Sequence, residues 1–360
     1  MTKRSTKTYG GPINHTPMMR GITRTMCLAL AVSAAPSIGI FSPQAAAAQS
    51  IDRSLYNGGK ARVNRSSYLR SLTEAVASAS CRVNGGIGTE TAKQQLATSR
   101  EDFDRIIDGL VNGNAALGMP GAEQRGRTLE VLTETGSLWE PLDVAAERLA
   151  SGSGSGSDAS TIGNGFSDLF EQTEQLAAVV SGQYSDPQQL LQSDATVLNF
   201  AVRQRALAYR MTRAMCEIAT GTRSGDPQQD LQSSVDLFQQ TLIALRDGFA
   251  AAGINPPPND AVRKSLENTF EVWQQQRGIF DSALAGQTPS ADDVIASAAL
   301  SEELSVAMNN AITLYLIASP GQDGVYRVPL EAYARDELAN WLTNPELIAA
   351  IQAQNAAHAD

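Results

Sequence analysis

Residues of the same type recur at a fixed spacing of 135 along this 360-residue chain. Seven pairs share that offset: Asn64 and Asn199, Arg70 and Arg205, Cys81 and Cys216, Phe103 and Phe238, Leu110 and Leu245, Gly113 and Gly248, and Gly118 and Gly253. After a one-residue gap, Trp139 aligns with Trp273. Chance does not readily keep one offset across Arg, Cys, Phe, Gly and Trp. The chain is therefore interpreted as a tandem duplication, and each copy has the size of a small helical bundle.

Each copy is predicted to contain four helices. In the first copy they span 64–83, 90–116, 121–150 and 160–180, and in the second 195–219, 226–252, 261–285 and 291–317. Asp186-Pro187 and Asp226-Pro227 each place a capping Asp before a Pro at the first helical position. Few segments alternate with the period of a strand. We therefore expect an all-α fold, with two tandem antiparallel four-helix bundles packed side by side as a pseudo-dimer.

The ends of the chain differ from this repeat. Residues 1–48 contain no Asp or Glu, and basic residues precede an apolar run that ends in small residues, which is typical of a signal peptide cleaved near Ala48. The predicted domains are then repeat 1 (49–188), repeat 2 (189–322) and a short helical C-terminal extension (323–360). Beyond residue 48 the chain has 23 basic and 38 acidic residues. That net negative charge argues against nucleic acid as a partner.

The first helix of the second copy carries a motif. Its sequence LNFAVRQRALAYRM (198–211) resembles the PilJ-type sensor domain of type IV pilus methyl-accepting chemotaxis transducers and the related nitrate and nitrite sensor kinases. Tyr209 is closer to the nitrate sensors, whereas Val202 stands where those sensors have Gly. The resemblance implies a periplasmic four-helix bundle in which the residue matching Arg205 grips an anion between two first helices of a dimer. In the first copy, only Asn64 and Arg70 match this motif.

Helix geometry relates the repeated arginines to the repeated cysteines. Each Arg precedes its Cys by eleven residues, which is about 1,100° at ~100° per residue, so both lie on one helix face. If the two first helices lie side by side and parallel, Arg70 faces Arg205 and Cys81 faces Cys216. Facing guanidinium groups repel unless an anion lies between them, and their planar donor forks suit nitrate, nitrite or a carboxylate. The candidate ligand residues are therefore Arg70, Arg205, Asn64, Asn199 and Tyr209.

Plainer interpretations stay open for each of these residues. A helix-surface Arg is most often solvated, and Arg70 has Glu74 one turn later as a neutralising partner. Asn64 and Asn199 lie about 120° round the helix from the arginines, which favours capping or packing over contact with the same ligand. Cys81 and Cys216 are either two small buried side chains or a disulfide. Trp139, Trp273, Phe103 and Phe238 are expected to be core anchors.

Enzyme chemistry finds little support in the sequence. His358 is the single histidine after residue 48 and lies two residues from the C-terminus, which argues against a histidine-based triad or a multi-histidine metal site; no phosphate-binding glycine loop follows a strand, and no CxxC occurs. The sequence therefore predicts a periplasmic binding or sensing protein for a small anion. It would signal through a separate membrane-bound chemoreceptor or sensor kinase. A non-catalytic structural or adaptor protein of the cell envelope is the alternative, and the oligomeric state is left open.

Overall fold

Helices account for all the regular structure in the part of the chain that the computed structural model describes, residues 58–184, 192–222 and 225–318. Those ranges contain no strand, only two isolated β-bridges, so the all-α prediction is confirmed. The predicted signal peptide, the C-terminal extension and the Asp186-Pro187 cap lie outside the described residues.

The helices follow one another in two sets. The first set contains α1 (Gly59–Asn84), α2 (Thr89–Asn112), the short 3₁₀ helix η2 (Ala115–Leu117), α3 (Gly126–Ser151) and α4 (Gly156–Tyr184). The second contains α5 (Gln192–Thr220), α6 (Pro227–Asp247), η3 (Ala250–Ala252), α7 (Asp260–Gln276), η4 (Arg277–Phe280), α8 (Asp281–Leu284) and α9 (Ala291–Ala318). Every predicted helical segment contains helix, but the segment predicted as one helix over 261–285 is divided into α7, η4 and α8, and α3 begins at Gly126, not at residue 121.

Two glycines explain why the second helix of each set is shorter than predicted. The second helix of each set was expected to continue to residue 116 or 252, but it ends at Gly113 or Gly248, which have φ values of 83° and 85°. These positive φ values are strained for any residue with a Cβ. A 3₁₀ helix and an isolated bridge follow each glycine, Asn114 with Met119 and Phe249 with Ile254. The same turn geometry thus occurs twice, 135 residues apart.

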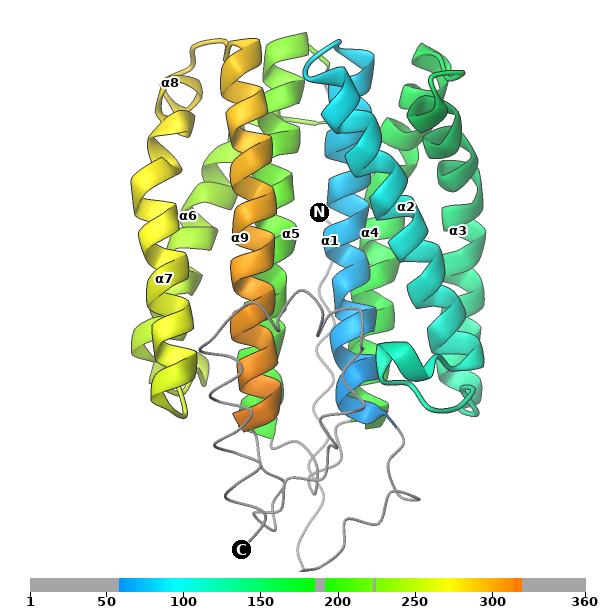
Figure 1. The fold of residues 1–360 in the computed structure, drawn as a ribbon, viewed down its shortest axis with the longest axis vertical. Coiled ribbons are helices and arrows are strands. Elements are labelled where there is room, and N and C mark those ends of the chain that lie inside the picture. The colour runs from blue at the N-terminus through cyan, green and yellow to red at the C-terminus, as the bar shows by residue number, and fades with distance from the viewer. Residues whose placement is uncertain (1–57, 185–191, 223–224, 319–360) are drawn as a thin grey trace, which may run out of the picture. The chain divides into compact units, whose positions relative to one another are not determined.

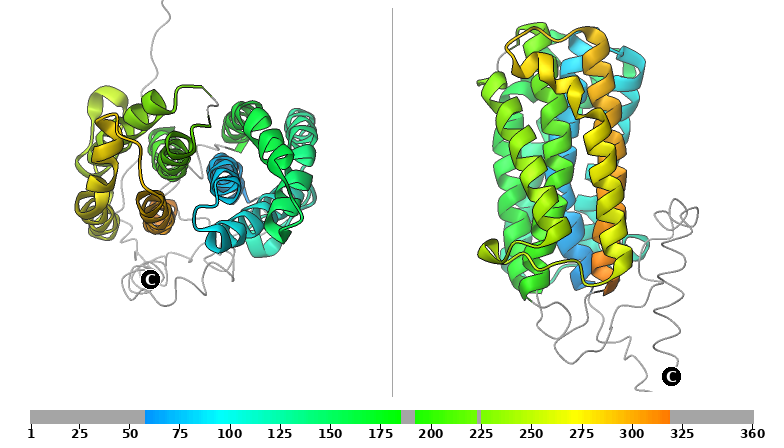
Figure 2. Two further views of the ribbon diagram at one scale, coloured as in Figure 1. Left: turned by 90° about the horizontal axis from the view of Figure 1, so that it is seen from above. Right: turned by 90° about the vertical axis from the view of Figure 1, so that its left-hand side faces the viewer.

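Two hydrophobic cores lie on either side of a central helix pair. α1 packs against α2 and α4, and α3 lies across from it, while α5 packs against α6 and α9, and α7 lies across from it. α1 and α5 also pack against each other, so each first helix serves its own bundle and the contact between the bundles (Figures 1 and 2). The buried apolar residues form one cluster for each set of helices.

Aromatic pairs anchor the two cores at matching places. Phe103 stacks on Trp139 with ring centroids 4.1 Å apart, and Phe238 contacts Trp273 at 4.7 Å. All four rings are buried, which confirms them as core anchors. None of the helices in the described ranges is long and apolar enough to span a membrane.

Candidate functional site

The contact between α1 and α5 brings together residues that the sequence singled out. A disulfide joins Cys81 to Cys216, with the two Cα atoms 6.2 Å apart. Hydrogen bonds join Arg70 to Asn199 and Arg205 to Asn64. Arg213 on α5 bonds Glu74 on α1, and further along both helices Cys216 bonds Cys81, so residue numbers rise together and α1 and α5 are parallel. Residues 135 apart therefore lie at the same height along the contact.

The two arginines are bonded reciprocally. Nη2 of Arg70 donates to Oδ1 of Asn199 at 3.2 Å, and Nη2 of Arg205 donates to Oδ1 of Asn64 at 3.3 Å. Arg70 is 4% exposed and Arg205 is 2% exposed, so neither is the solvated surface side chain of the plainer interpretation. The asparagines do not cap their helices. Each lies across the contact from the Arg of the other helix.

Arg70 lies in a strongly charged environment. Its Nε donates to the Ser67 carbonyl at 3.3 Å, and its Nη1 lies 3.8 Å from the Glu174 carboxylate on α4. That carboxylate also accepts a 2.8 Å hydrogen bond from Arg203. Burial lowers the pKa of Arg70 to about 10; Glu174 opposes the shift, and the charges of Arg203 and Arg205 add to it. At neutral pH Arg70 is still protonated, and its positive charge is poorly solvated.

Arg205 has different neighbours, which the sequence did not indicate. Its Nη1 donates to Oδ1 of Asn309 on α9 at 2.9 Å, and its guanidinium lies 4.2 Å from the centroid of the Tyr68 ring on α1. Both contacts suit a buried guanidinium, since an amide oxygen and an aromatic face each attract positive charge. Asn309 belongs to no motif and reaches the site only through the packing of α9 on α5, so no spacing in the sequence predicts it.

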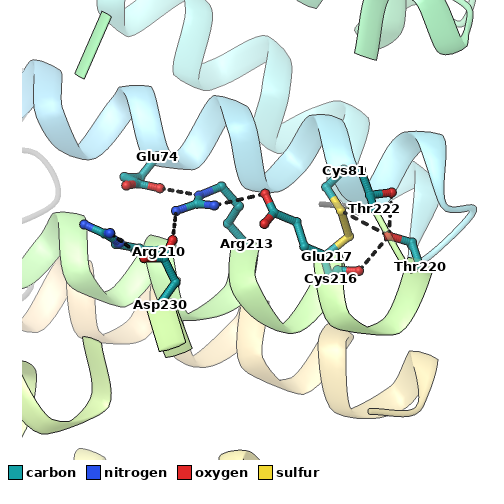
Figure 3. Close-up of polar contacts among 9 residues, drawn as sticks. All are labelled: Glu74, Cys81, Arg210, Arg213, Cys216, Glu217, Thr220, Thr222 and Asp230. Atoms are coloured by element: carbon teal, nitrogen blue, oxygen red, sulfur yellow. Dashed lines mark hydrogen bonds and ion pairs between the residues drawn. A yellow bond between two sulfur atoms is a disulfide. The ribbon is translucent and has the colours of Figure 1, made fainter. Parts of the chain in front are cut away.

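A second buried arginine cluster lies between these residues and the disulfide (Figure 3). Arg213 donates to Glu74 at 2.8 Å, to Glu217 at 2.9 Å and to Asp230 at 2.9 Å, and it stacks on Phe166. Burial opposes the charge of Arg213, but the charges of Glu74 and Glu217 outweigh it and raise its pKa.

The partner considered for Arg70 is therefore engaged elsewhere. Glu74 lies one turn after Arg70 in the sequence, yet its carboxylate bonds Arg213 on α5 instead. Arg213 and Glu74 are both almost fully buried, and the Arg213 guanidinium bonds the Glu74 carboxylate directly across the helix contact. The Arg213–Glu74 ion pair thus connects the two sets of helices, while Arg213 also pairs with Glu217 on its own helix.

Tyr209 stands apart from the two arginines. It is buried, and its hydroxyl donates to Oε2 of Glu302 on α9 at 3.1 Å. Burial raises the pKa of Tyr209 well above its usual value, with Tyr68 and Glu302 adding to the effect. It lines a cavity of about 380 Å³, which none of Arg70, Arg205, Asn64 and Asn199 lines. The five candidate residues therefore divide into a four-residue polar cluster and one residue of a neighbouring cavity.

The polar cluster offers donors for an anion and no site for a cation. Within the described ranges, no group of three or more His, Cys, Asp or Glu side chains is placed to hold a metal ion. Buried guanidinium groups and amides can bind and orient a ligand, but the cluster contains no nucleophile paired with a base.

Comparison with known families bears on the class of protein. Residues 188–298 match the family described as "Type IV pili methyl-accepting chemotaxis transducer N-term", PilJ. The match contains α5 to α8 and the start of α9, and hence Asn199 and Arg205. It supports a sensory domain of the chemotaxis transducer type, a non-catalytic class, for this part of the chain. No curated protein matches the sequence.

Proposed function

We propose that the protein is a sensory module that binds a small anion between α1 and α5. The observation that carries this proposal is the pair of buried arginines, Arg70 and Arg205, one from each helix. Burying a guanidinium group costs roughly several kcal/mol of free energy unless its charge is compensated. The charge of Arg205 also contributes to the lowered pKa of Arg70, so the two groups lie close enough to repel. An anion between them relieves that repulsion.

The donor geometry selects the class of anion. Two guanidinium groups present planar forks of N–H donors, which match nitrate, nitrite or a carboxylate. In this structure Asn199 and Asn64 accept one hydrogen bond from each fork. A bound anion would accept these hydrogen bonds in their place. The two amides then become free to donate to the same ligand, which gives Asn64 and Asn199 a role in the site.

We further infer that the two sets of helices are copies of one repeat, packed as a pseudo-dimer in a single chain. The parallel α1 and α5, the reciprocal Arg–Asn bonds and the repeated turns at Gly113 and Gly248 support this inference. In that arrangement residues 49–188 and 189–322 are the two repeats, and the site lies on their pseudo-twofold axis. One chain would then supply both halves of a site that the resembling sensors assemble from two.

The setting of this module follows from the same resemblance. A cleaved signal peptide over residues 1–48 would place the protein in the periplasm, where the resembling sensor domains lie. Residues 323–360 would form a helical extension available for docking. The signal would then pass to a separate membrane-bound chemoreceptor or sensor kinase.

A structural or adaptor role is the alternative, and one contact favours it. The Glu174 carboxylate lies 3.8 Å from Arg70 and already offsets part of its charge. With the disulfide and the Arg213 cluster, Arg70 and Arg205 would then only hold the two bundles together. No small-molecule ligand is needed in that case.

Titration calorimetry of the mature protein with nitrate, nitrite and acetate separates the two functions. We expect at least one of these anions to bind the native sequence, and Arg205→Ala to abolish binding. Arg205→Lys keeps the charge but loses the planar fork, so we expect it to bind at least tenfold more weakly. Arg263→Ala on α7 is the matched control, because this exposed Arg pairs with Asp260 on its own helix and lies outside the α1–α5 contact. Absence of binding by any anion, or equal binding by Arg205→Ala in a folded state verified by circular dichroism, contradicts the proposal.

A further inference from the structure

The cavity beside Tyr209 lies on one side of the α1–α5 contact, between the two sets of helices. It measures about 380 Å³, near the lower end of the roughly 300–1,000 Å³ of small-molecule sites. Its walls come from α1 and α2 of the first set and from α5 and α9 of the second. It opens to solvent between exposed residues of α2 and α9, which include Gln94, Thr98 and Ala299.

The opposite side of the contact shows why a cavity remains here. There Arg213 fills the space between α5, α1 and α4, bonded to Glu74, Glu217 and Asp230. The residue 135 positions before Arg213 is Ser78, whose side chain is far shorter. The position of α1 that matches Arg213 therefore carries no long side chain, and Arg82, one turn further along α1, lines the cavity instead. The space that is filled by protein on one side is left open on the other.

One wall of the cavity carries a buried positive charge. Arg82 is 3% exposed, and its Nη1 and Nη2 donate to Gln95 at 2.9 Å and to Thr91 at 3.0 Å. Its Nε has no hydrogen-bond partner among the described residues. Leaving a buried donor unsatisfied costs roughly 1–3 kcal/mol, so this N–H favours an acceptor that enters the cavity.

The facing wall carries a negative charge. The Glu302 carboxylate accepts from Gln95 at 2.6 Å and from Tyr209 at 3.1 Å. Two hydrogen bonds leave acceptor capacity on a carboxylate, which has about four lone-pair sites. Burial raises the pKa of Glu302, although Tyr209, Gln95 and Arg82 lower it. Gln95 bonds both Arg82 and Glu302, so the two opposite charges lie on either side of one amide.

We propose that this cavity binds a small zwitterion, an α-amino acid, with its carboxylate on Arg82 and its ammonium group on Glu302. A zwitterion matches both charges and adds no net charge to the Arg82–Glu302 pair, whereas a ligand with a single charge matches one of them and adds net charge to a partly dehydrated site. The side chain of the ligand would lie against Leu72, Ile295 and Ala298, which supply an apolar surface. This site does not use Arg70 or Arg205 to bind the ligand, although Tyr68, whose ring contacts the Arg205 guanidinium, lines the cavity.

Calorimetric titration of the mature protein with each of the twenty protein amino acids tests the proposal. We expect at least one uncharged amino acid to bind. Acetate and ethylamine, which each carry one of the two charges, should bind this site at least tenfold more weakly. Glu302→Gln should weaken amino acid binding at least tenfold, and Ala299→Trp should block the mouth of the cavity. Glu303→Gln is the matched control, since this neighbouring exposed carboxylate contacts Gln276 and not the cavity.

The outcomes separate this site from the one between the arginines. Amino acid binding that survives in Arg205→Lys but falls in Glu302→Gln supports the cavity site, whatever the result for nitrate. Three results overturn it: no amino acid binds, binding is unchanged in both Glu302→Gln and Ala299→Trp, or acetate binds as tightly as the best amino acid in Arg205→Ala, which lacks the anion site.

Discussion

The disulfide between Cys81 and Cys216 is expected to supply a large part of the stability of the fold. It closes a loop between residues separated by 135 positions in the sequence. The chain-entropy relation for a loop of that length gives about 5 kcal/mol at 25 °C. This is comparable to the entire ~5–15 kcal/mol by which domains are usually stable. Replacing both cysteines by alanine should therefore lower the free energy of unfolding by up to about 5 kcal/mol.

Urea unfolding of the mature protein, followed by circular dichroism, measures this effect. Cys81→Ala/Cys216→Ala should unfold at a lower urea concentration than the native sequence. Its m-value should be larger, because an unfolded chain without the crosslink exposes more surface. Adding a thiol reductant should shift the native sequence towards the double variant and leave the double variant unchanged. That second comparison is the control for side-chain effects of the alanines.

Two results would refute the reasoning. The first is the titration of two free thiols in the urea-denatured, unreduced mature protein, which would show that the bond does not form. The second is equal unfolding midpoints for the native sequence with and without reductant. Either result would leave the α1–α5 contact to side-chain packing and ion pairs alone.

Three further predictions concern polar residues of α5 and α6. Arg213→Met should destabilise the fold by about 3–5 kcal/mol in urea unfolding, because it leaves the buried Glu74 carboxylate without its cation; an effect below about 1 kcal/mol would contradict this. Burial alone would raise the pKa of Asp230, but hydrogen bonds from Arg210 and Arg213 lower this pKa overall. The ionised Asp230 therefore stabilises the fold fully above the usual carboxyl pKa, and this stabilisation is lost as pH falls through the lowered pKa. The stability difference between the native sequence and Asp230→Asn should therefore shrink from about pH 5 to about pH 2, and a constant difference would argue against the linkage. Gln204→Leu should stabilise the fold by about 1–3 kcal/mol, because the fully buried Gln204 amide makes no hydrogen bond among the described residues; a lower thermal midpoint would contradict this.

Much of the fold was predictable because it rests on local signals. The repeat offset, the Asp226 cap and the aromatic anchors place helices at their observed positions. Asp226 does accept a hydrogen bond from the Gln229 N–H at 3.1 Å, as the Asp-Pro pattern predicts. The ends at Gly113 and Gly248 were missed because a glycine inside a helical pattern is compatible with either continuation or a stop. The positive φ that decides between them depends on the following turn.

The site was predictable only where the repeat itself carried the signal. Eleven-residue spacing placed Arg70, Arg205 and the cysteines on one face of each helix, and they lie at the α1–α5 contact. The reciprocal bonds to Asn64 and Asn199 were not expected. The angle of about 120° compares positions around one helix, whereas each of these bonds is made by a long arginine side chain that reaches the other helix. Asn309 and Glu302 come from α9 and depend on tertiary packing alone.

The pairing of charges also depended on packing. Sequence spacing favoured Arg70 with Glu74, whereas the structure pairs Glu74 with Arg213 across the helix contact. Helical spacing identifies neighbours on one helix, but a parallel partner helix adds a second set of neighbours at similar distances. In this buried contact, the geometry between the helices therefore decides which cation pairs with Glu74.

A crystal structure of the mature protein grown with nitrate tests the central claim most directly. The proposal predicts a planar anion between Arg70 and Arg205, accepting hydrogen bonds from both guanidinium groups in place of Asn199 and Asn64. Both arginines still bonded to these asparagines, with no anion between them at a saturating nitrate concentration, would contradict it.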